Sequence, residues 1–232
     1  MGSGNRIVGF QEKPPPQMCV SNLVSTGLYV LEPDVLDLIP RDRQVDFAKD
    51  VFPVVLESGK PLYGYRAKGF WVDIGSVEGF LEASEWILSR LPNSISSTAD
   101  VSKANLRGKV WIGDRAILEK GVNIQGPVYI EDSCVVGKGT SLRSGTILKS
   151  GVSVGESSSL DGATVFGSTK INSRVTLNKC ILDERCEIGS GARIEEYAVI
   201  GRGCRIDENA LIRSGVKLDP ESEGEREKVI KT

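Results

Sequence analysis

The chain has 232 residues, of which 40% are apolar and 26% charged, and its formal net charge is −2. This balance excludes a disordered or fibrous chain, and 29 basic against 31 acidic residues exclude a strong field that would attract nucleic acid or an anionic membrane. No run approaches the ~20 apolar residues of a membrane span, and no secretory signal opens the chain, so we expect a cytoplasmic protein.

Histidine is absent, and the five cysteines form no CxxC pair. Without histidine the chain lacks the usual general base and the usual transition-metal ligand. The odd number and the spacing of the cysteines favour reduced, mostly buried thiols over a disulfide framework or a zinc site.

The first ninety residues predict a mixed α/β region. VSTGLYVL at 24–31 predicts a buried strand in which Gly27 allows a close approach, and residues 62–67 alternate like a second strand. Ser76 is placed to cap the last of three expected helices. These helices cover 33–39, 47–56 and 77–88. A polar, Ser-rich stretch at 91–105 then predicts a linker.

From Leu106 onward an aliphatic residue recurs every six positions. Six is neither the period of a helix nor that of a plain strand, so each unit is expected to be a short strand followed by a corner that Gly or Asn can turn. Three such sides would close a triangular coil of about 18 residues, and roughly six coils ~4.8 Å apart would form a prism. The pattern resembles the hexapeptide repeat of left-handed β-helices, and the handedness comes from this resemblance alone.

Two irregularities interrupt the repeat, because the step shortens to five after Phe166 and again after Leu177. They mark either a ligand or partner site or a harmless irregularity of a loop. Cys186 and Cys204 lie one coil apart at a small-residue position and are expected to stack in the core. Known hexapeptide acyltransferases and zinc hydratases rely on histidine, so a structural or oligomerising role, as a dimer or trimer, is the expectation here.

Four segments occur in the order of the second half of the sugar-1-phosphate nucleotidylyltransferases, and the chain resembles most closely the mannose-1-phosphate guanylyltransferase type. The segments are GFQEKP (9–14), STGLYVL (25–31), VDFAKDVFP (45–53) and GFWVDIGSVEGFLEA (69–83). The resemblance implies an α/β partial nucleotidyltransferase lobe at 5–92 and a parallel, left-handed β-helix at 101–219, followed by a charged tail at 220–232. It implies the reaction of a nucleoside triphosphate with a sugar 1-phosphate to give a nucleotide sugar and pyrophosphate. Which sugar and which nucleotide stays open.

The same resemblance assigns roles to five residues. Glu12 would accept hydrogen bonds from sugar hydroxyls, and Lys13 would bind the sugar phosphate; the alternative for both is a solvated turn. Gly27 would let the backbone approach the sugar or else serve strand packing. Asp46 would add a polar contact nearby, and the alternative is that it has no role at the site. Asp73 would be a ligand of Mg²⁺, which accepts one or two carboxylates together with phosphates and water; the alternative is a cap of the helix that follows.

The family's first half carries a Gly-rich phosphate loop, a following arginine and a second acid that shares the metal, and nothing in this sequence matches them. We therefore expect no complete catalytic set in this chain alone, and nucleotide and Mg²⁺ binding only with a complementing half. The chain would be the sugar-binding and oligomerising portion of a nucleotidylyltransferase, inactive by itself. The alternative is a non-catalytic β-helix scaffold or regulatory subunit of a nucleotidylyltransferase assembly.

Overall fold

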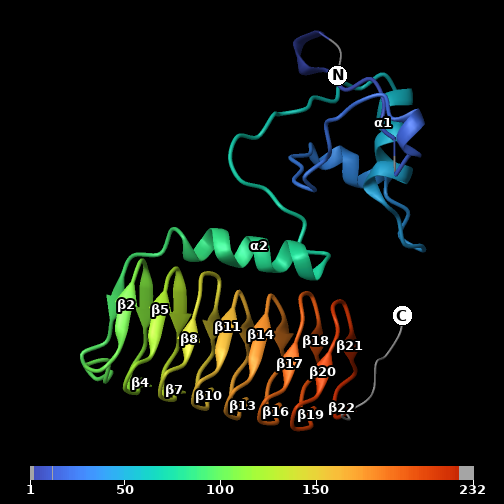
Figure 1. Cartoon of the computed structure of the whole chain (residues 1–232). Coiled ribbons are helices and arrows are strands. Elements are labelled where there is room, and N and C mark those ends of the chain that lie inside the picture. The colour runs from blue at the N-terminus through green and yellow to red at the C-terminus, as the bar shows by residue number, and fades with distance from the viewer. Residues whose placement is uncertain (1–2, 12, 225–232) are drawn as a thin grey trace. The chain divides into compact units, whose positions relative to one another are not determined.

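The computed structural model describes residues 3–11 and 13–224, and it divides into two compact units, Met1–Trp71 and Val72–Thr232. We call the first unit the lobe and the second the β-helix unit (Figure 1). The predicted order, a small lobe followed by a parallel β-helix, is confirmed. The sequence analysis draws the lobe to residue 92, whereas contacts in the structure group the helix at 77–88 with the β-helix.

The lobe consists of short helical turns joined by extended segments. Its helical elements are the 3-10 turns η1 (Ser3–Asn5), η2 (Pro16–Met18) and η3 (Pro33–Leu38), the π-helical turn η4 (Phe47–Val51) and helix α1 (Phe52–Glu57). The helices predicted at 33–39 and 47–56 are thus confirmed. Val35, Val51 and Val55 form the small buried cluster that these turns enclose.

Neither strand predicted in the lobe forms. Residues 24–31 are extended but exposed and unpaired, so the prediction of a buried strand there is wrong. Residues 62–67 contribute a single antiparallel bridge, between Tyr63 and Arg6, rather than a strand. A strand with apolar side chains on both faces is stable when other layers cover those faces, and the described part of the lobe supplies no such layers.

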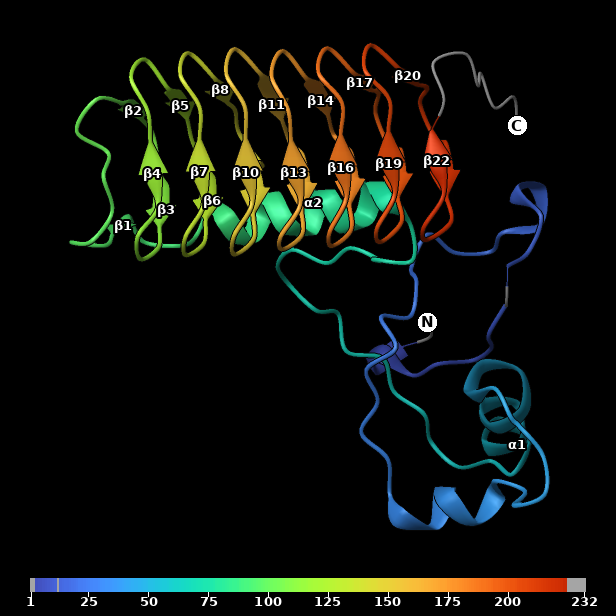
Figure 2. The ribbon, with the colours of Figure 1, turned by 90° about the horizontal axis from the view of Figure 1, so that it is seen from below.

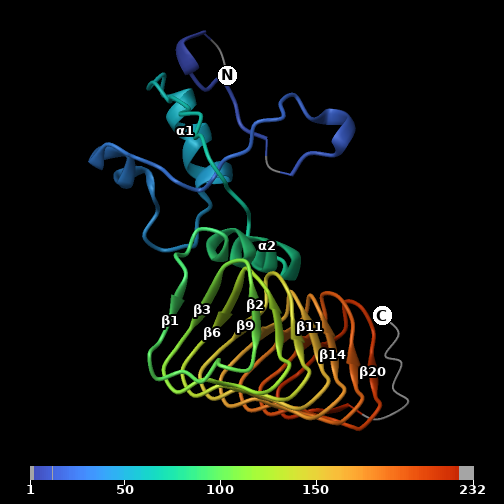
Figure 3. The same ribbon diagram turned by 60° about the vertical axis from the view of Figure 1, so that its left-hand side comes forward.

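The β-helix unit winds through three parallel sheets that form the sides of a triangular prism (Figures 2 and 3). The first sheet has the order β1 (Ser94–Ile95), β3 (Val110–Ile112), β6 (Val128–Ile130), β9 (Ile147–Leu148), β12 (Thr164–Val165), β15 (Ile181–Leu182), β18 (Val199–Ile200) and β21 (Lys217–Leu218). The second has β22 (Glu223–Gly224), β19 (Arg205–Ile206), β16 (Glu187–Ile188), β13 (Lys170–Ile171), β10 (Ser153–Val154), β7 (Val135–Val136) and β4 (Ile117–Leu118). The third has β2 (Asn105–Arg107), β5 (Asn123–Gln125), β8 (Ser141–Leu142), β11 (Ser159–Asp161), β14 (Thr176–Asn178), β17 (Arg193–Ile194) and β20 (Leu211–Ile212).

The stack is longer than the predicted six coils, with eight strands in the first sheet and seven in each of the others. The sequence estimate falls short because β1 and β22 lie outside the aliphatic repeat. β22 also shows that the coil continues into the segment expected to be a charged tail, of which residues 225–232 lie outside the described residues.

The aliphatic residues of the predicted repeat fill the interior of the prism, except that Val165 takes the place predicted for Phe166. In the first sheet Leu148 pairs with Val165 and Val165 with Leu182, so Val165 is the buried residue and Phe166 is half-buried at the corner. The repeat had placed Phe166 inside. The first five-residue side therefore runs from Leu160 to Val165, one side earlier than predicted. The second runs from Leu177 to Leu182, as predicted.

Helix α2 (Val77–Leu88) lies lengthwise on the prism, along the corner between the third and first sheets (Figures 1 and 3). The Ser144 hydroxyl donates to the Glu85 carboxylate at 2.8 Å, and the Lys109 ammonium donates to the Ser89 carbonyl just beyond the helix. Both shortened sides of the prism cross this same corner. The register breaks thus belong to the edge that carries α2.

No helix among the described residues is both long enough and apolar enough to cross a membrane.

Candidate functional site

Lys13 lies in a loop that is closed by a single side chain. The Gln11 amide donates to the Met18 carbonyl at 2.9 Å and accepts from the Val20 N–H at 3.0 Å, which ties the two ends of the loop together. Lys13 has a φ of +44°, a backbone conformation uncommon for a side chain other than Gly, Asn or Asp. Its ammonium is exposed, and no acid within residues 3–11 and 13–224 pairs with it. Glu12 lies outside the described residues.

Gly27 has a φ of +76°, a backbone conformation that favours glycine at this turn. Its N–H donates to the Ser25 hydroxyl at 3.3 Å, and that hydroxyl also bonds the Tyr29 hydroxyl at 2.9 Å. A Cβ built on Gly27 would meet no heavy atom within 4 Å. Because the strand does not form, the strand-packing alternative for Gly27 has no support here, and the space beside the residue is open.

Asp46 already has a structural task. Its Oδ1 accepts hydrogen bonds from the Ala48 N–H at 2.8 Å and the Lys49 N–H at 3.0 Å, so it caps η4. Asp50 supports the same turn, because its carboxylate accepts from the Asp46 N–H at 2.7 Å and from Arg43 at 3.2 Å. These two bonds, the backbone one first, lower the pKa of Asp50. The sequence analysis did not single out Asp50.

An aromatic cluster joins three of the four segments that carry the family resemblance. Phe10, next to the EKP sequence, stacks on Phe52 with ring centroids 4.9 Å apart. Tyr29, next to Gly27, packs on Phe52 at 4.9 Å and on Phe47 at 5.6 Å, and Phe47 directly follows Asp46. The cluster therefore ties together the chain segments of Lys13, Gly27 and Asp46. Each of these segments contains an aromatic residue near its candidate, but the sequence alone does not show that the rings meet.

Asp73 belongs to the β-helix unit, in the turn that leads into α2. Its Oδ1 accepts from the Gly75 N–H at 3.0 Å, and the side chain is exposed. The Ser76 hydroxyl accepts from the Gly79 N–H at 3.0 Å and caps α2, as predicted. The capping alternative for Asp73 thus gains no support, and among the described residues no hydrogen bond to its second carboxylate oxygen is present.

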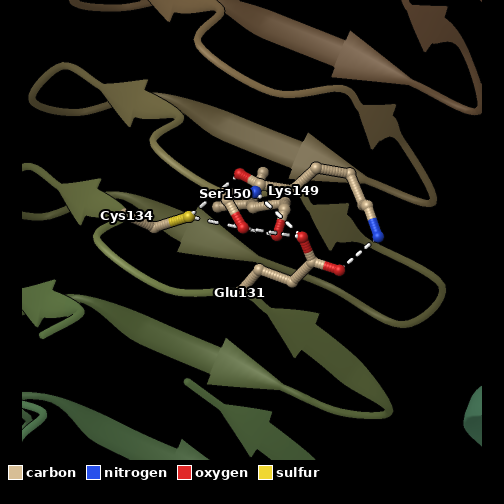
Figure 4. A network of polar contacts seen from close by, with 5 residues as sticks. Glu131, Cys134, Lys149 and Ser150 are labelled. Atoms are coloured by element: carbon tan, nitrogen blue, oxygen red, sulfur yellow. Dashed lines mark hydrogen bonds and ion pairs between the residues drawn. The ribbon is translucent and has the colours of Figure 1, made fainter. Parts of the chain in front are cut away.

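A network of hydrogen bonds and one ion pair connects two successive coils at the corner between the first and second sheets (Figure 4). Glu131 pairs with the Lys149 ammonium, and its other oxygen accepts from the Ser150 N–H at 3.0 Å and hydroxyl at 2.9 Å. The thiol of Cys134 donates to the Lys149 carbonyl at 3.2 Å. Burial raises the pKa of Cys134 to about 11, so this thiol is no nucleophile near neutral pH.

The other cysteines also fit the expected pattern. Cys180, Cys186 and Cys204 are buried and unlinked, and Cys19 is exposed. Within the described ranges, no group of three or more Cys, His, Asp or Glu side chains gathers in a way that could hold a metal ion.

Comparison with known proteins gives matches to two separate parts of the chain. Residues 1–90 match the family described as "Nucleotidyl transferase", and residues 124–223 match the "GMPPB C-terminal domain". The two matches together place a nucleotidyltransferase region ahead of a β-helix domain, which is the arrangement that the sequence resemblance implies. The chain is 33% identical over 132 residues to a UTP–glucose-1-phosphate uridylyltransferase of Synechocystis, covering 50% of this chain and 34% of that protein. It is 35% identical over 101 residues to a mannose-1-phosphate guanyltransferase of Saccharomyces cerevisiae, covering 42% of this chain and 27% of that protein.

The chain therefore spans about a third of the length of the curated relatives it matches. The two relatives differ in both nucleotide and sugar. Among solved structures, a putative acetyltransferase of Bacillus cereus shares 24% identity with a TM-score of 0.34, covering 55% of this chain and 78% of that one. That likeness concerns the fold alone.

Proposed function

We propose that this chain is the sugar-1-phosphate-binding and β-helix portion of a nucleotidyltransferase. In the completed site, an oxygen of the sugar 1-phosphate attacks the α-phosphorus of a nucleoside triphosphate, and the bond to the β-phosphate breaks to release pyrophosphate. The observation that carries the proposal is the match of residues 1–90 to the nucleotidyl transferase family, followed by the match of the β-helix to a C-terminal domain of the same enzymes. The cytoplasm, where free thiols stay reduced, is the proposed location.

The residues of the lobe would bind the sugar phosphate. Lys13 would supply the positive charge for the phosphate, because it is exposed and has no acidic partner in the described part of the chain. Gly27 would let the sugar approach the open space beside its Cα. Asp46 would contribute by shaping η4, since its Oδ1 is engaged by two backbone N–H groups. Glu12, outside the described residues, keeps its proposed role toward the sugar hydroxyls.

Asp73 fits a magnesium site in part. It offers one exposed carboxylate with a free oxygen, and Mg²⁺ is commonly held by one or two carboxylates together with phosphate oxygens and water. A bound Mg²⁺ would neutralise charge on the reacting phosphates. Because Asp73 belongs to no group of three or more Cys, His, Asp or Glu side chains that could hold a metal ion among residues 3–11 and 13–224, the remaining ligands would come from the nucleotide and from a complementing half.

Binding of mannose 1-phosphate, followed by NMR line shifts or calorimetry, tests the sugar-phosphate role without requiring turnover. Lys13→Ala should weaken binding by about ten- to a hundredfold, as expected for the loss of a charge-assisted hydrogen bond. Lys120→Ala, which removes a lysine at a corner of the β-helix, is the matched control and should leave binding unchanged. Equal affinities for Lys13→Ala and the unmodified chain would refute the assignment.

The alternative is a non-catalytic scaffold or regulatory subunit that pairs with a complete nucleotidyltransferase. This alternative is favoured by the position of the hydrophobic core. All but one of the largest fully buried side chains belong to the β-helix rather than to the lobe. We propose a homo-oligomer, a dimer or trimer formed through the flat sides of the prism. Light scattering of the chain with and without a full-length relative separates the two functions, since a scaffold should form a mixed assembly and leave sugar phosphate unbound.

A further inference from the structure

The outward face of the first sheet carries a continuous row of mostly apolar side chains, and Figure 3 shows the first strands of this sheet along one side of the prism. We call this row the apolar stripe; along the ladder of paired residues it runs Trp111, Tyr129, Ile147, Thr164, Ile181 and Val199. Trp111 and Tyr129 stack at one end with ring centroids 4.4 Å apart. All members except Thr164 are half-buried in the single chain. Contiguous apolar surface of this kind usually marks an interaction site.

The other two sheets carry more polar side chains in the equivalent places. The outward row of the second sheet begins with the exposed Ile117 and Val135 but continues with Lys170, Glu187 and Arg205, which form ion pairs along the prism. The outward row of the third sheet is mostly Asn, Ser and Thr. Polar and charged side chains are well solvated by water, so the first sheet is the face of the described prism that gains most from being covered.

The shape of the apolar stripe fits a second copy that is turned end for end. Neighbouring strands lie ~4.8 Å apart, so Trp111 and Val199, five strands apart, are separated by ~24 Å. Thr164 is only 2% exposed and is therefore recessed between the half-buried Ile147 and Ile181. A two-fold axis between Ile147 and Thr164 would place Ile147 of each copy over the recess at Thr164 of the other. The same rotation lays the aromatic end of the stripe on its aliphatic end.

The charges near the two ends of the stripe are also complementary. Lys217 continues the ladder one strand beyond the stripe, is exposed, and pairs with no acid in the described part of the chain. Beside the other end lies Asp114, and a hydrogen bond from the Ser96 hydroxyl lowers the pKa of this carboxyl. The end-for-end arrangement brings Lys217 to within about one strand spacing of the Trp111 ring, and an ammonium over an indole ring is attracted to it. A parallel arrangement would place the two Lys217 side chains together instead.

We propose that two copies of this chain pair through the apolar stripe, face to face and antiparallel, as a two-fold dimer. This inference rests on the homo-oligomer of the proposed function and names the face and the arrangement that form it. A face ~24 Å long and ~15 Å wide buries roughly 700 Å² over both copies, less than the ~1,200 Å² of a stable interface. The dimer is therefore weak, and its population depends on the concentration of the chain.

The first test is the mass of the full 232-residue chain by light scattering over a wide range of concentration, which should rise from one chain to two and no further. Ile147→Lys buries a charge at the centre of the stripe and should weaken the dimer by at least about tenfold. Ile181→Lys is a second variant of the same kind. The matched control is Ile117→Lys, because Ile117–Leu118 of the second sheet has the sequence and the outward position of Ile147–Leu148, and it should leave the dimer unchanged.

Cross-linking tests the antiparallel arrangement. Ser94 and Lys217 lie at opposite ends of the outward row of the first sheet and would face each other across the dimer. Facing sheets lie ~10 Å apart, which is too far for a disulfide, so a short bismaleimide is the reagent. In a Cys19→Ser background, a mixture of Ser94→Cys and Lys217→Cys chains should cross-link, whereas Ser94→Cys chains alone should not. The remaining cysteines are buried.

A mass of one chain at every concentration would overturn the inference, and so would a trimer. Equal effects of Ile147→Lys and Ile117→Lys, or cross-linking of Ser94→Cys chains with one another, would also overturn it. A complex that forms only with a full-length relative would assign the stripe to that partner instead. Binding of mannose 1-phosphate, measured in the same samples, separates this inference from the sugar-phosphate role. A dimer without binding retains the stripe and counts against that role, whereas binding without a dimer does the reverse.

Discussion

Gly79 makes room for the backbone of Asp73, because a Cβ built on Gly79 would lie 2.0 Å from the Asp73 carbonyl oxygen. Contacts shorter than 3.0 Å at such a backbone atom force the chain to move. The first turn of α2 therefore determines where the turn that bears Asp73 can lie. Glycine in a helix normally costs stability, and its presence at this position is explained by the close approach.

Gly79→Ala should displace the turn at 73–76 and destabilise the start of α2 by about 1–3 kcal/mol, the usual cost of an overpacked site. The Gly75 amide should lose its protection from exchange, because its bond to the Asp73 carboxylate depends on the same turn. Glu82→Ala, on the exposed side of α2, is the control and should leave both quantities unchanged. A Gly79→Ala chain with an unaltered Gly75 amide would contradict the account.

Glu131→Gln should lower the free energy of unfolding at pH 7 by about 1 kcal/mol, since the charged acceptor for Lys149 and Ser150 is lost. Burial acts to raise the pKa of Glu131, but the hydrogen bonds from Lys149 and Ser150 outweigh it, and the pKa is lowered. The stabilisation is therefore present above the ordinary pKa of a glutamate and is lost as the pH falls through the lowered value.

Urea unfolding between pH 7 and pH 3 measures this effect. The difference between the unmodified chain and Glu131→Gln should shrink as the pH falls. Glu156→Gln, an exposed corner residue, should track the unmodified chain throughout. A difference that does not depend on pH would show that the carboxylate charge of Glu131 plays no part.

The cysteines should separate into one reactive and four protected thiols. A disulfide exchange reagent at pH 8 should label Cys19 at once and the buried thiols only after unfolding. Burial raises the pKa of Cys134 and Cys186 to about 11 and that of Cys180 to about 12. A second thiol that reacts rapidly in the folded chain would show that a corner of the prism opens.

These raised pKa values also predict alkaline sensitivity. The folded chain holds the thiol protons more tightly than the unfolded chain, so the stability is complete below about pH 9 and declines as the pH rises toward the folded values. Replacing Cys134 and Cys180 by alanine should reduce this decline. Ala116 and Ala163 occupy the equivalent positions one coil away, so the core accepts alanine there. An equal decline in the variant would contradict the assignment.

The β-helix could be predicted from sequence because its core residues recur with a fixed six-residue period, which is typical of a β-helix. The error at Phe166 arose because Val165 and Phe166 are both apolar, so the sequence leaves open on which side the missing residue falls. Pairing with Leu148 and Leu182 decides in favour of Val165. The cap of α2 at Ser76 was predictable because it depends on residues close in sequence.

The lobe was harder to predict. Whether residues 24–31 form a strand depends on neighbouring strands and layers, and local residue propensities carry no information about these neighbours. The candidate residues were read from motifs, and the aromatic contacts of Phe10 and Tyr29 that join those motifs are long-range. The cap formed by Asp46 was not predicted, although the sequence analysis places a helix at 47–56, directly after this residue.

The most direct test of the central claim, that this chain holds a sugar-phosphate site without a complete nucleotide site, is a pyrophosphate-release assay on the pure chain. GTP, mannose 1-phosphate and Mg²⁺ are supplied, and a full-length relative serves as the positive control. The account predicts no release above background. Robust turnover by the chain alone would contradict it.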